Sequence, residues 1–300
     1  MIYYLTGERL AGSIEVFLTT PWGRPLAPRI TTFTYQQIFA LPPAALPRGT
    51  YIFTGLSRAL GSIDPPSPRR LLAARLRQEL VERFGPGAVL NDPQRSLKRY
   101  ALLQVLRERG LNDFAAHRAD ALPASARFPL FLREEHGTLY EKTALLANRA
   151  AYEAALARAG AHDGLLAIEY CDTADTAGVY RKYGAFVVGD RIVPRHLFFS
   201  RDWMVKWTEL TGAEQLAEEM AYIESNPHAA VLREVCALAN IQYGRVDYAL
   251  SGGRVQVWEI NTTPAVTHPE ATEDPVRYKV HQRFAELFAQ ALDAVDIGSA

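Results

Sequence analysis

The sequence predicts an α+β protein in which antiparallel hairpins and separate helices share one chain. Residues 180–196 and 245–264 both have β-rich runs on either side of a glycine-containing turn, which is a hairpin pattern. Other segments place apolar residues at helical spacing, and these are residues 69–84, 96–109, 142–159, 212–226, 228–240 and 275–294. The length of 300 residues allows one large domain or two modest ones.

The composition is that of an ordinary globular protein without an overall charge. Hydrophobic residues make up 48% of the chain, which is enough for a buried core. Lys plus Arg equals Asp plus Glu at 33 each, so no net field favours nucleic acid or an anionic membrane. No apolar run approaches the roughly 20 residues of a membrane helix, and the first residues lack a signal-peptide pattern. Two cysteines, Cys171 and Cys236, are too few for a disulfide framework. We therefore expect a cytoplasmic protein that binds neither nucleic acid nor membrane, and its oligomeric state stays open.

Residues 1–90 are predicted to form a small α/β domain. Its expected strands and short helix are, in order, Ile2–Leu5, Ile14–Thr20, Thr34–Phe39 (helix) and Thr50–Thr54. A helix at Arg69–Phe84 follows a proline-rich break, and its arginines are expected on a solvated face. The segment Gly55–Arg58 comes directly after a strand, where it could face a ligand.

Residues 91–300 are predicted to form the second domain. Its expected elements before the hairpins are a helix at Ser96–Arg109, a strand at Phe128–Arg133, a helix at Lys142–Ala159 and a strand at Gly164–Cys171. Phe198–Trp203 is expected as a loop that packs its aromatic side chains on the core. The C-terminal helix is expected to be a structural cover.

The hairpin within residues 245–264 is the stretch around which the chain is organised. If Ser251-Gly252-Gly253 forms the turn, Leu250 faces Arg254 across the ladder. Side chains alternate between the two faces of a strand, so three polar residues then share one face. They are Asp247, Glu259 and Asn261.

Two carboxylates and one amide oxygen on one sheet face make a site of hard oxygen ligands. Mg²⁺ prefers such ligands, usually beside substrate phosphates. The alternative is an edge hairpin with its polar residues turned to water. Glu259 and Asn261 stand between large apolar residues, where an unpaired charge would be costly, and this favours the metal site. Without a cation the two carboxylates are expected to repel each other and to raise at least one pKa.

The order Arg-Val-Asp-Tyr at 245–248 and Glu-Ile-Asn-Thr-Thr-Pro at 259–264 resembles the metal-binding end of the ATP-grasp superfamily. The resemblance extends over residues 91–264. It implies an ATP-grasp fold with the nucleotide between two α+β subdomains, preceded by a pre-grasp domain at residues 1–90.

The resemblance also implies which residues bind the nucleotide and its metal. Lys98 at a helix start and Arg133 at a strand end match cations that contact phosphates. Glu169, Tyr170 and Cys171 match the hinge that pairs with adenine, and Asp172 or Asp175 matches the acid that holds the ribose. Asp247, Glu259 and Asn261 match the magnesium ligands.

A cation in the hairpin at residues 180–196 is expected to neutralise charge during phosphoryl transfer. Arg195, with His196 beside it at a strand end, is the preferred catalytic candidate, and Arg181 and Lys182 are the alternatives. The loop at residues 134–137 is charged, whereas family members often have a glycine-rich loop over the phosphates at this place.

The function implied by the resemblance is an ATP-dependent ligase that uses Mg²⁺ and joins a carboxylate to an amine through an acyl-phosphate. Its substrates would be small molecules or peptides. Three other functions stay open, namely a small-molecule kinase, a non-catalytic nucleotide-binding regulator, and a binding module without nucleotide, which the buried oxygen site disfavours. The charged loop at residues 134–137 favours the regulator.

Overall fold

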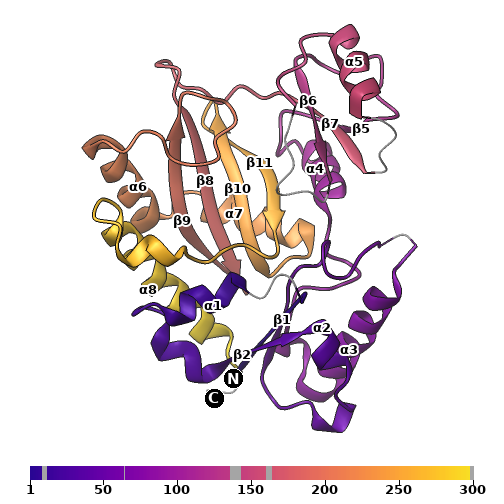
Figure 1. Cartoon of the computed structure of the whole chain (residues 1–300), viewed down its shortest axis with the longest axis vertical. Helices are drawn as coiled ribbons and strands as arrows, with labels where there is room; N and C mark the ends of the chain where they lie inside the picture. The colour runs from indigo at the N-terminus through magenta and orange to yellow at the C-terminus, as the bar shows by residue number, and fades with distance from the viewer. Residues whose placement is uncertain (9–11, 64, 136–142, 160–163, 298–300) are drawn as a thin grey trace.

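The computed structural model describes residues 1–8, 12–63, 65–135, 143–159 and 164–297, and it has the α+β architecture that the sequence predicts (Figure 1). The described residues form three sheets. No helix in this part of the chain combines the length and the apolar character needed to cross a membrane. Four short 3₁₀ helices connect the larger elements: η1 (Arg24–Arg29), η2 (Pro43–Ala45), η3 (Pro86–Ala88) and η4 (Pro269–Thr272).

The N-terminal sheet is parallel, with the strand order β2-β1-β3-β4. Its strands are β1 (Ile2–Thr6), β2 (Ile30–Thr34), β3 (Thr50–Phe53) and β4 (Val89–Leu90). Its helices are α1 (Gly12–Thr19), α2 (Tyr35–Phe39) and α3 (Pro68–Phe84). The predicted short helix is therefore confirmed, and Thr34 begins it with a capping box that includes Gln37.

The predicted strand at Ile14–Thr20 is wrong, because this segment belongs to helix α1. Its β-branched residues favoured a strand. Ile14 and Phe17 are three positions apart and both fully buried, which is the spacing of one helix face. Burial of that face against the C-terminal helix outweighs the local strand preference.

The smallest sheet is antiparallel and has the order β5-β7-β6. Its strands are β5 (Ala116–Arg118), β6 (Leu130–Glu134) and β7 (Leu165–Glu169), and helix α5 (Arg149–Ala159) packs on it. Helix α4 (Arg99–Glu108) connects it with the large sheet. The helix expected from Lys142 begins only at Arg149, and Lys142 itself lies outside the described residues.

The large sheet is antiparallel, with the order β11-β10-β8-β9. Its strands are β8 (Tyr180–Val188), β9 (Arg191–Ser200), β10 (Tyr243–Ser251) and β11 (Arg254–Asn261). Helices α6 (Ala213–Ser225) and α7 (Ala229–Ala239) pack on one face. Helix α8 (Tyr278–Val295) covers part of the other face (Figure 1). The uncovered remainder of that face carries the polar residues described below.

Strand β9 is longer than predicted, because it continues to Ser200. The expectation of a loop at Phe198–Trp203 is therefore wrong for Phe198, Phe199 and Ser200, which are strand residues. Trp203 does lie beyond the strand, and its ring packs 5.0 Å from that of Phe131 on the small sheet.

The turn of the β10–β11 hairpin contains two residues and not three. Ser251 pairs with Arg254, and Gly252 and Gly253 form the turn with φ values of 56° and 78°. Two successive residues with positive φ are typical of the tight hairpin turn that glycine favours. The predicted pairing of Leu250 with Arg254 is wrong, since Leu250 pairs with Val255.

The side chain of Asn91 joins the N-terminal sheet to the large sheet. Its Nδ2 donates to the carbonyl oxygens of Phe53 (2.8 Å) and Tyr243 (2.9 Å). Its Oδ1 accepts from the backbone N–H groups of Gln242 (2.8 Å) and Tyr243 (2.9 Å). Asn91 is buried and has a φ of 68°, a region that asparagine tolerates better than most residues.

The two predicted domains, 1–90 and 91–300, share one core. Tyr4 and Phe17 belong to the same buried cluster as Phe288 of α8. The N-terminal ammonium also pairs with Asp296, 2.5 Å away. The boundary at residue 90 stays a prediction. Contacts from residues before and after this boundary attach the N-terminal sheet to the large sheet and to α8.

We expect Asn91→Ala to destabilise the protein by about 2–4 kcal/mol, because it leaves buried backbone groups of Phe53, Gln242 and Tyr243 unsatisfied. Urea unfolding measures the loss. Asn240→Ala is the matched control, because Asn240 also has a positive φ of 52° but its side chain makes no hydrogen bond to another described residue. Equal losses in the two variants would show that the hydrogen bonds of Asn91 contribute nothing beyond the backbone conformation.

Candidate functional site

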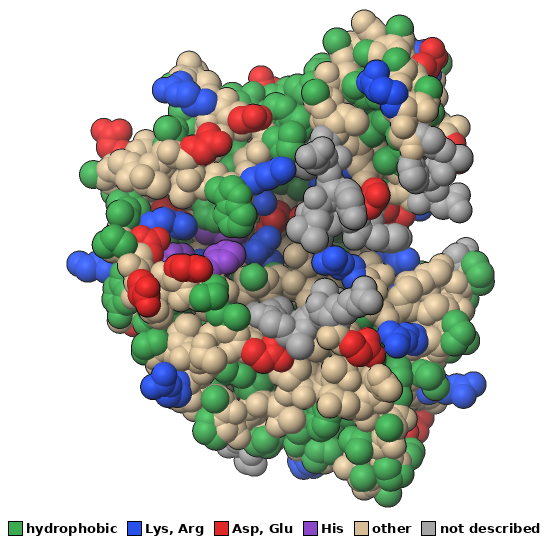
Figure 2. Space-filling view, in the orientation of Figure 1, with side chains coloured by type: hydrophobic (Ala, Val, Ile, Leu, Met, Phe, Trp, Pro, Cys, Tyr) green, Lys and Arg blue, Asp and Glu red, His purple; other side chains and the backbone are tan. Residues whose placement is uncertain are grey.

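A cavity of about 430 Å³ lies between the large sheet and the small sheet. Its walls come from β6, the end of β7, β8, the segment that follows β9, and the β10–β11 hairpin. Figure 2 shows Lys and Arg side chains, with His beside them, in the hollow of this face of the molecule. The cavity has an aromatic end and a charged end.

The aromatic end is formed by side chains from both sheets. Trp203 packs against Phe131, with ring centroids 5.0 Å apart, and against Tyr170, at 5.9 Å and nearly perpendicular. Trp258 and Cys171 complete this part of the wall. Walls built from aromatic faces suit a flat apolar ring, because such rings stack or pack edge-on at these distances.

Of the three predicted hinge residues, Tyr170 and Cys171 line the cavity and the Glu169 side chain does not. The buried carboxylate of Glu169 accepts hydrogen bonds from Arg127 Nε (2.9 Å), Arg127 N (3.0 Å) and Ala115 N (3.1 Å). Burial alone would raise its pKa, but these hydrogen bonds outweigh burial and lower the pKa. Only the backbone of Glu169 can therefore belong to a hinge.

Neither candidate for the ribose-binding acid is among the residues that line the cavity, although Thr173 between them is. Asp172 accepts a hydrogen bond from the Tyr170 hydroxyl at 3.1 Å. Asp175 pairs with Arg181 at 2.5 Å, and this pairing lowers its pKa to about 2. Arg181 in turn contacts Glu218 at 2.7 Å, so its charge is already shared by two carboxylates.

The charged end is a row of residues that crosses the large sheet. Glu259 on β11 pairs with Asp247 on β10, Asp247 pairs with Gly184 on β8, and Gly184 pairs with His196 on β9. The pairing of Asp247 with Glu259 depends on a β-bulge at Trp258. Tyr248 pairs with Val257, so in a regular ladder the next residue, Asp247, would pair with Trp258. Glu259 would then point to the opposite face of the sheet from Asp247.

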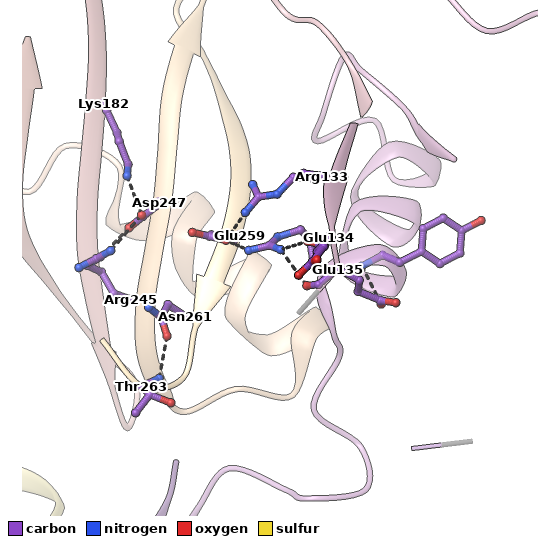
Figure 3. Close-up of polar contacts among 11 residues, drawn as sticks. Arg133, Glu134, Glu135, Lys182, Arg245, Asp247, Glu259, Asn261 and Thr263 are labelled. Carbon is purple, nitrogen blue, oxygen red and sulfur yellow. Dashed lines mark hydrogen bonds and ion pairs between the residues drawn. The ribbon is translucent and has the colours of Figure 1, made fainter. Parts of the chain in front are cut away.

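Asp247 is held by two cations. Arg245 donates from Nε to Oδ1 (2.6 Å) and from Nη2 to Oδ2 (3.0 Å), and Lys182 Nζ lies 2.9 Å from Oδ2 (Figure 3). The side chain of Asp247 is 2% exposed. Burial alone would raise its pKa, but Arg245 and Lys182 outweigh burial and lower it. The expectation that repulsion raises this pKa is therefore wrong for Asp247, because the neighbouring charges are positive.

Glu259 is also held by two cations. Its Oε2 accepts from Arg99 Nη2 and lies 3.3 Å from Arg133 Nη2. Figure 3 shows Glu259 and Arg133 pointing toward each other from β11 and β6. The other terminal nitrogen of Arg99, Nη1, donates to the carbonyl oxygens of Glu134 (2.9 Å) and Glu135 (2.7 Å).

The three predicted magnesium ligands lie together, and each has a side-chain oxygen that contacts a cation or accepts a backbone hydrogen bond. Asn261 Oδ1 accepts from Thr263 N at 2.8 Å, next to the two paired carboxylates. Among the described residues no group of three or more His, Cys, Asp and Glu side chains is arranged to hold a metal ion. Asp247, Glu259 and Asn261 have the hard-oxygen chemistry that Mg²⁺ requires. Their chemistry therefore fits the ion, while both carboxylates are paired with cations in this structure.

Lys98 precedes helix α4 and lines a second cavity of about 60 Å³. The loop Gly55–Arg58 and the segment Asn261–Thr263 form its other walls, and it shares Glu259 and Asn261 with the large cavity. Burial, and then the charge of Arg70, lower the pKa of Lys98. The sequence-based placement of the α3 arginines on a solvated face is wrong for Arg70, which is buried and donates to four backbone carbonyl groups.

Arg195 is not brought to either cavity. It lies within β9 and not at a strand end, and its guanidinium sits under α8. Its Nε donates to Val266 O at 2.9 Å, and the group packs over the ring of Phe284 at 4.5 Å. His196 is buried as well, with its ring stacked 4.0 Å from that of Phe198.

Two residues at the charged end were missed by the sequence-based reasoning. Arg245 could have been found, because it stands two positions before Asp247 and therefore shares its strand face. Arg99 carries no such signal, since its position next to Lys98 on a helix start does not say which of the two reaches Glu259.

No family model matches the chain, and no curated protein matches its sequence. Several solved structures are similar to the model. D-alanine–D-alanine ligase from Bacillus anthracis is 14% identical, with a TM-score of 0.53 and coverage of 98% of this chain and 96% of that one. The same enzyme complexed with ATP is 13% identical, with a TM-score of 0.52 and the same two coverages. A RimK domain ATP-grasp protein from Sphaerobacter thermophilus is 15% identical, with a TM-score of 0.53 and coverage of 95% and 98%.

The chain therefore has the ATP-grasp fold along nearly its whole length. The predicted resemblance is confirmed at the level of the fold. At 13–15% identity the likeness establishes the fold alone, and the reaction has to be argued from the site.

We expect Gly184→Ala to destabilise the protein by about 1–3 kcal/mol, because a Cβ at this position would lie 2.4 Å from His196 Cε1 and 2.5 Å from Nε2. Both residues are in the row that contains Asp247, so the clash falls at the charged end. Urea unfolding measures the loss, and His196→Ala in the same chain should recover part of it. Gly87→Ala is the control, because a Cβ there meets no atom within 4 Å. A neutral Gly184→Ala would show that the His196 ring moves freely.

Proposed function

We propose that the protein is an ATP-dependent ligase that joins a carboxylate to an amine through an acyl-phosphate. The observation that carries this proposal is the shape of the large cavity, which has an aromatic end and a cation-rich end with two carboxylates. A nucleotide has the same order of parts, a flat base followed by phosphates. The similarity in fold to a D-alanine–D-alanine ligase, one form of which is complexed with ATP, supports the same proposal.

The aromatic residues Phe131, Trp203 and Trp258 would enclose the base, and the backbone of Tyr170 and Cys171 would pair with its edge. The phosphates would extend toward Arg133 and Lys182, where charge-assisted hydrogen bonds are available.

Asp247, Glu259 and Asn261 would hold Mg²⁺, which supplies positive charge to the transferred phosphoryl group. Arg99, Arg133 and Lys182 would orient the phosphate chain and neutralise its charge, so positioning supplies most of the catalysis. Arg195 would not contact substrate, because it is buried beneath α8.

The acid substrate would lie in the smaller cavity, between Gly55–Arg58 and Lys98. Its carboxylate oxygen would attack the γ-phosphate and release ADP, which leaves an acyl-phosphate. The amine would then displace inorganic phosphate and lose a proton as the amide forms. The smaller cavity touches the large one at Glu259 and Asn261, so the reacting groups would meet there.

A nucleotide-binding regulator without turnover is the second candidate. It is favoured by one observation, the pairing of both predicted metal-binding carboxylates with cations. A chain that only senses nucleotide has no need to release those carboxylates to a metal.

Measurement of ADP and inorganic phosphate with panels of amino acids and dipeptides separates the candidates. A ligase forms both products only when an acid and an amine are present. ADP without free phosphate would indicate a kinase, and ATP binding without ADP would indicate the regulator.

We expect Arg133→Ala to weaken ATP binding by roughly 1.5–3 kcal/mol, because it removes a charge-assisted contact to phosphate. Adenosine affinity should change little, since the base lies at the other end of the cavity. Isothermal titration of both ligands measures the two effects. Equal losses for ATP and adenosine would mean that Arg133 does not contact the phosphates.

We expect the protein to gain more thermal stability from ATP with Mg²⁺ than from ATP alone, since a ligand that binds only the folded state stabilises it by mass action. Glu259→Gln keeps the side-chain volume and removes a negative metal ligand, so the Mg²⁺-dependent part of the gain should fall sharply. Thermal-shift series on both proteins, with and without Mg²⁺, measure this difference. Identical Mg²⁺ responses would remove Glu259 from the metal site.

A further inference from the structure

The charges at the end of the large cavity do not balance. Two carboxylates, Asp247 and Glu259, each contact two cations. The four cations are Arg99, Arg133, Lys182 and Arg245. The formal charge of these six side chains is therefore +2, and the side chains are between 2% and 22% exposed.

Burial makes this excess charge unfavourable. The side chains of Arg99 and Arg133 are only 8% and 11% exposed. Burial, and then the positive charge of Arg133, lower the pKa of Arg99 to about 9, and burial lowers that of Arg133 to about 10. Both groups stay protonated at neutral pH. An entering anion would relieve their mutual repulsion, whereas a divalent cation alone would add to it.

We propose that the charged end is a polyphosphate site that binds its anion without a divalent metal, and that this anion releases the carboxylates for the metal. The phosphate oxygens would take Arg99 and Arg133 from Glu259, and Lys182 from Asp247. The carboxylate oxygens set free would then bind the metal together with Asn261. This inference rests on the proposed nucleotide site, and it does not require ligation.

The contacts of Arg99 suit such an exchange of partners. Its Nη1 is fixed to the carbonyl oxygens of Glu134 and Glu135, so only Nη2 has to change its partner from Glu259 to a phosphate. Arg133 reaches the same oxygen of Glu259 from β6, at 3.3 Å. We infer that both guanidinium groups stay where they are when the anion replaces Glu259 as their partner.

Asp247 differs from Glu259 in how many of its cation contacts an entering anion would break. Arg245 holds both of its oxygens and comes from the same strand, two positions away. Lys182 contributes a single ammonium contact at the end of a flexible side chain. We infer that Lys182 exchanges and that Arg245 stays with Asp247, so that Glu259 becomes the more available metal ligand.

Tripolyphosphate is the probe for the anion, because it has the phosphate chain and no base. Isothermal titration in the presence of EDTA measures its metal-free binding. Mn²⁺ serves as a spectroscopic substitute for Mg²⁺, and the electron paramagnetic resonance signal of free Mn²⁺ measures metal binding without the anion. The wild type should bind tripolyphosphate without metal. It should bind Mn²⁺ alone at least about tenfold more weakly than its tripolyphosphate complex does, after the Mn²⁺ held by tripolyphosphate in the absence of protein has been subtracted.

Arg99→Gln should change the two affinities in opposite directions. Metal-free tripolyphosphate should bind about 10- to 100-fold more weakly, because a charge-assisted contact is lost. Mn²⁺ alone should bind more tightly, because Glu259 has lost a competing cation. A residue with only a structural role would weaken both. Arg95→Gln is the matched control, an exposed arginine four positions earlier that contacts neither carboxylate, and it should leave both affinities unchanged.

Glu259→Gln supplies a second test should Arg99→Gln fail to fold. It frees two arginines from their carboxylate, so metal-free tripolyphosphate should bind more tightly while the response to Mn²⁺ falls. The proposal is overturned if wild type needs metal to bind tripolyphosphate, or if Mn²⁺ alone binds as well as with the anion. Phosphate release with an acid and an amine would still establish the ligase in that case. Tripolyphosphate binding without any ADP formation would leave this inference standing and reject the ligase.

Discussion

The pairing of two carboxylates, one buried and one half-buried, with four cations is the interaction on which the site depends. Asp247 and Glu259 line a cavity that also has aromatic walls, and a carboxylate in such a place stays ionised at low cost only with a partner. Their partners come from three sheet strands and one helix, so the ion pairs also join the small sheet to the large one. The cost of placing charges in such a site is high, and a buried pair of this kind is weak evidence for stability. It is better explained by what the charges do when a ligand arrives.

The rest of the fold keeps this row of charges in place. Helices α6 and α7 bury one face of the large sheet, and α8 covers only part of the other, which leaves the row at the edge of the covered area. Asn91 and the loop at Gly55 attach the N-terminal sheet to β10 and to Thr262, directly beside Asn261. By contrast, Trp203 reaches the small sheet mainly through ring contacts with Phe131 and Tyr170. The aromatic end is thus built from ring packing between the two sheets, and the charged end from ion pairs within the large sheet and from pairs that reach it from β6 and α4.

Much of the fold follows from local sequence patterns, because hairpins and amphipathic helices leave a periodic signal. The hairpins and most helices were predictable for this reason, whereas α1 was not, because burial against α8 overrides the β-branched residues between Ile14 and Thr19. The candidate site is harder to predict from sequence than the fold. The true register at the turn differs by one residue from the predicted one, and the bulge at Trp258 shifts the register by one more residue. The two shifts together amount to two residues, so Asp247 and Glu259 share a face as predicted. Neither a bulge nor the burial of Arg195 can be read from a single sequence, because both depend on packing against distant elements.

The fold of this chain defines its backbone arrangement, whereas its chemistry depends on the charged side chains at the candidate site. Similar folds at 13–15% identity show that the backbone frame tolerates replacement of most side chains. What the frame does is then decided by the few residues that face the cavity. Here those residues include an arginine, Arg99, which lines the smaller cavity, is anchored by two carbonyl groups and donates to Glu259, a residue that both cavities share. Because the anchor of Arg99 fixes its position, the proposed exchange of partners would free Glu259 through the charge of the ligand and not through a movement of the chain. The order proposed for anion and metal would then be a property of the side-chain charges, which the fold does not determine.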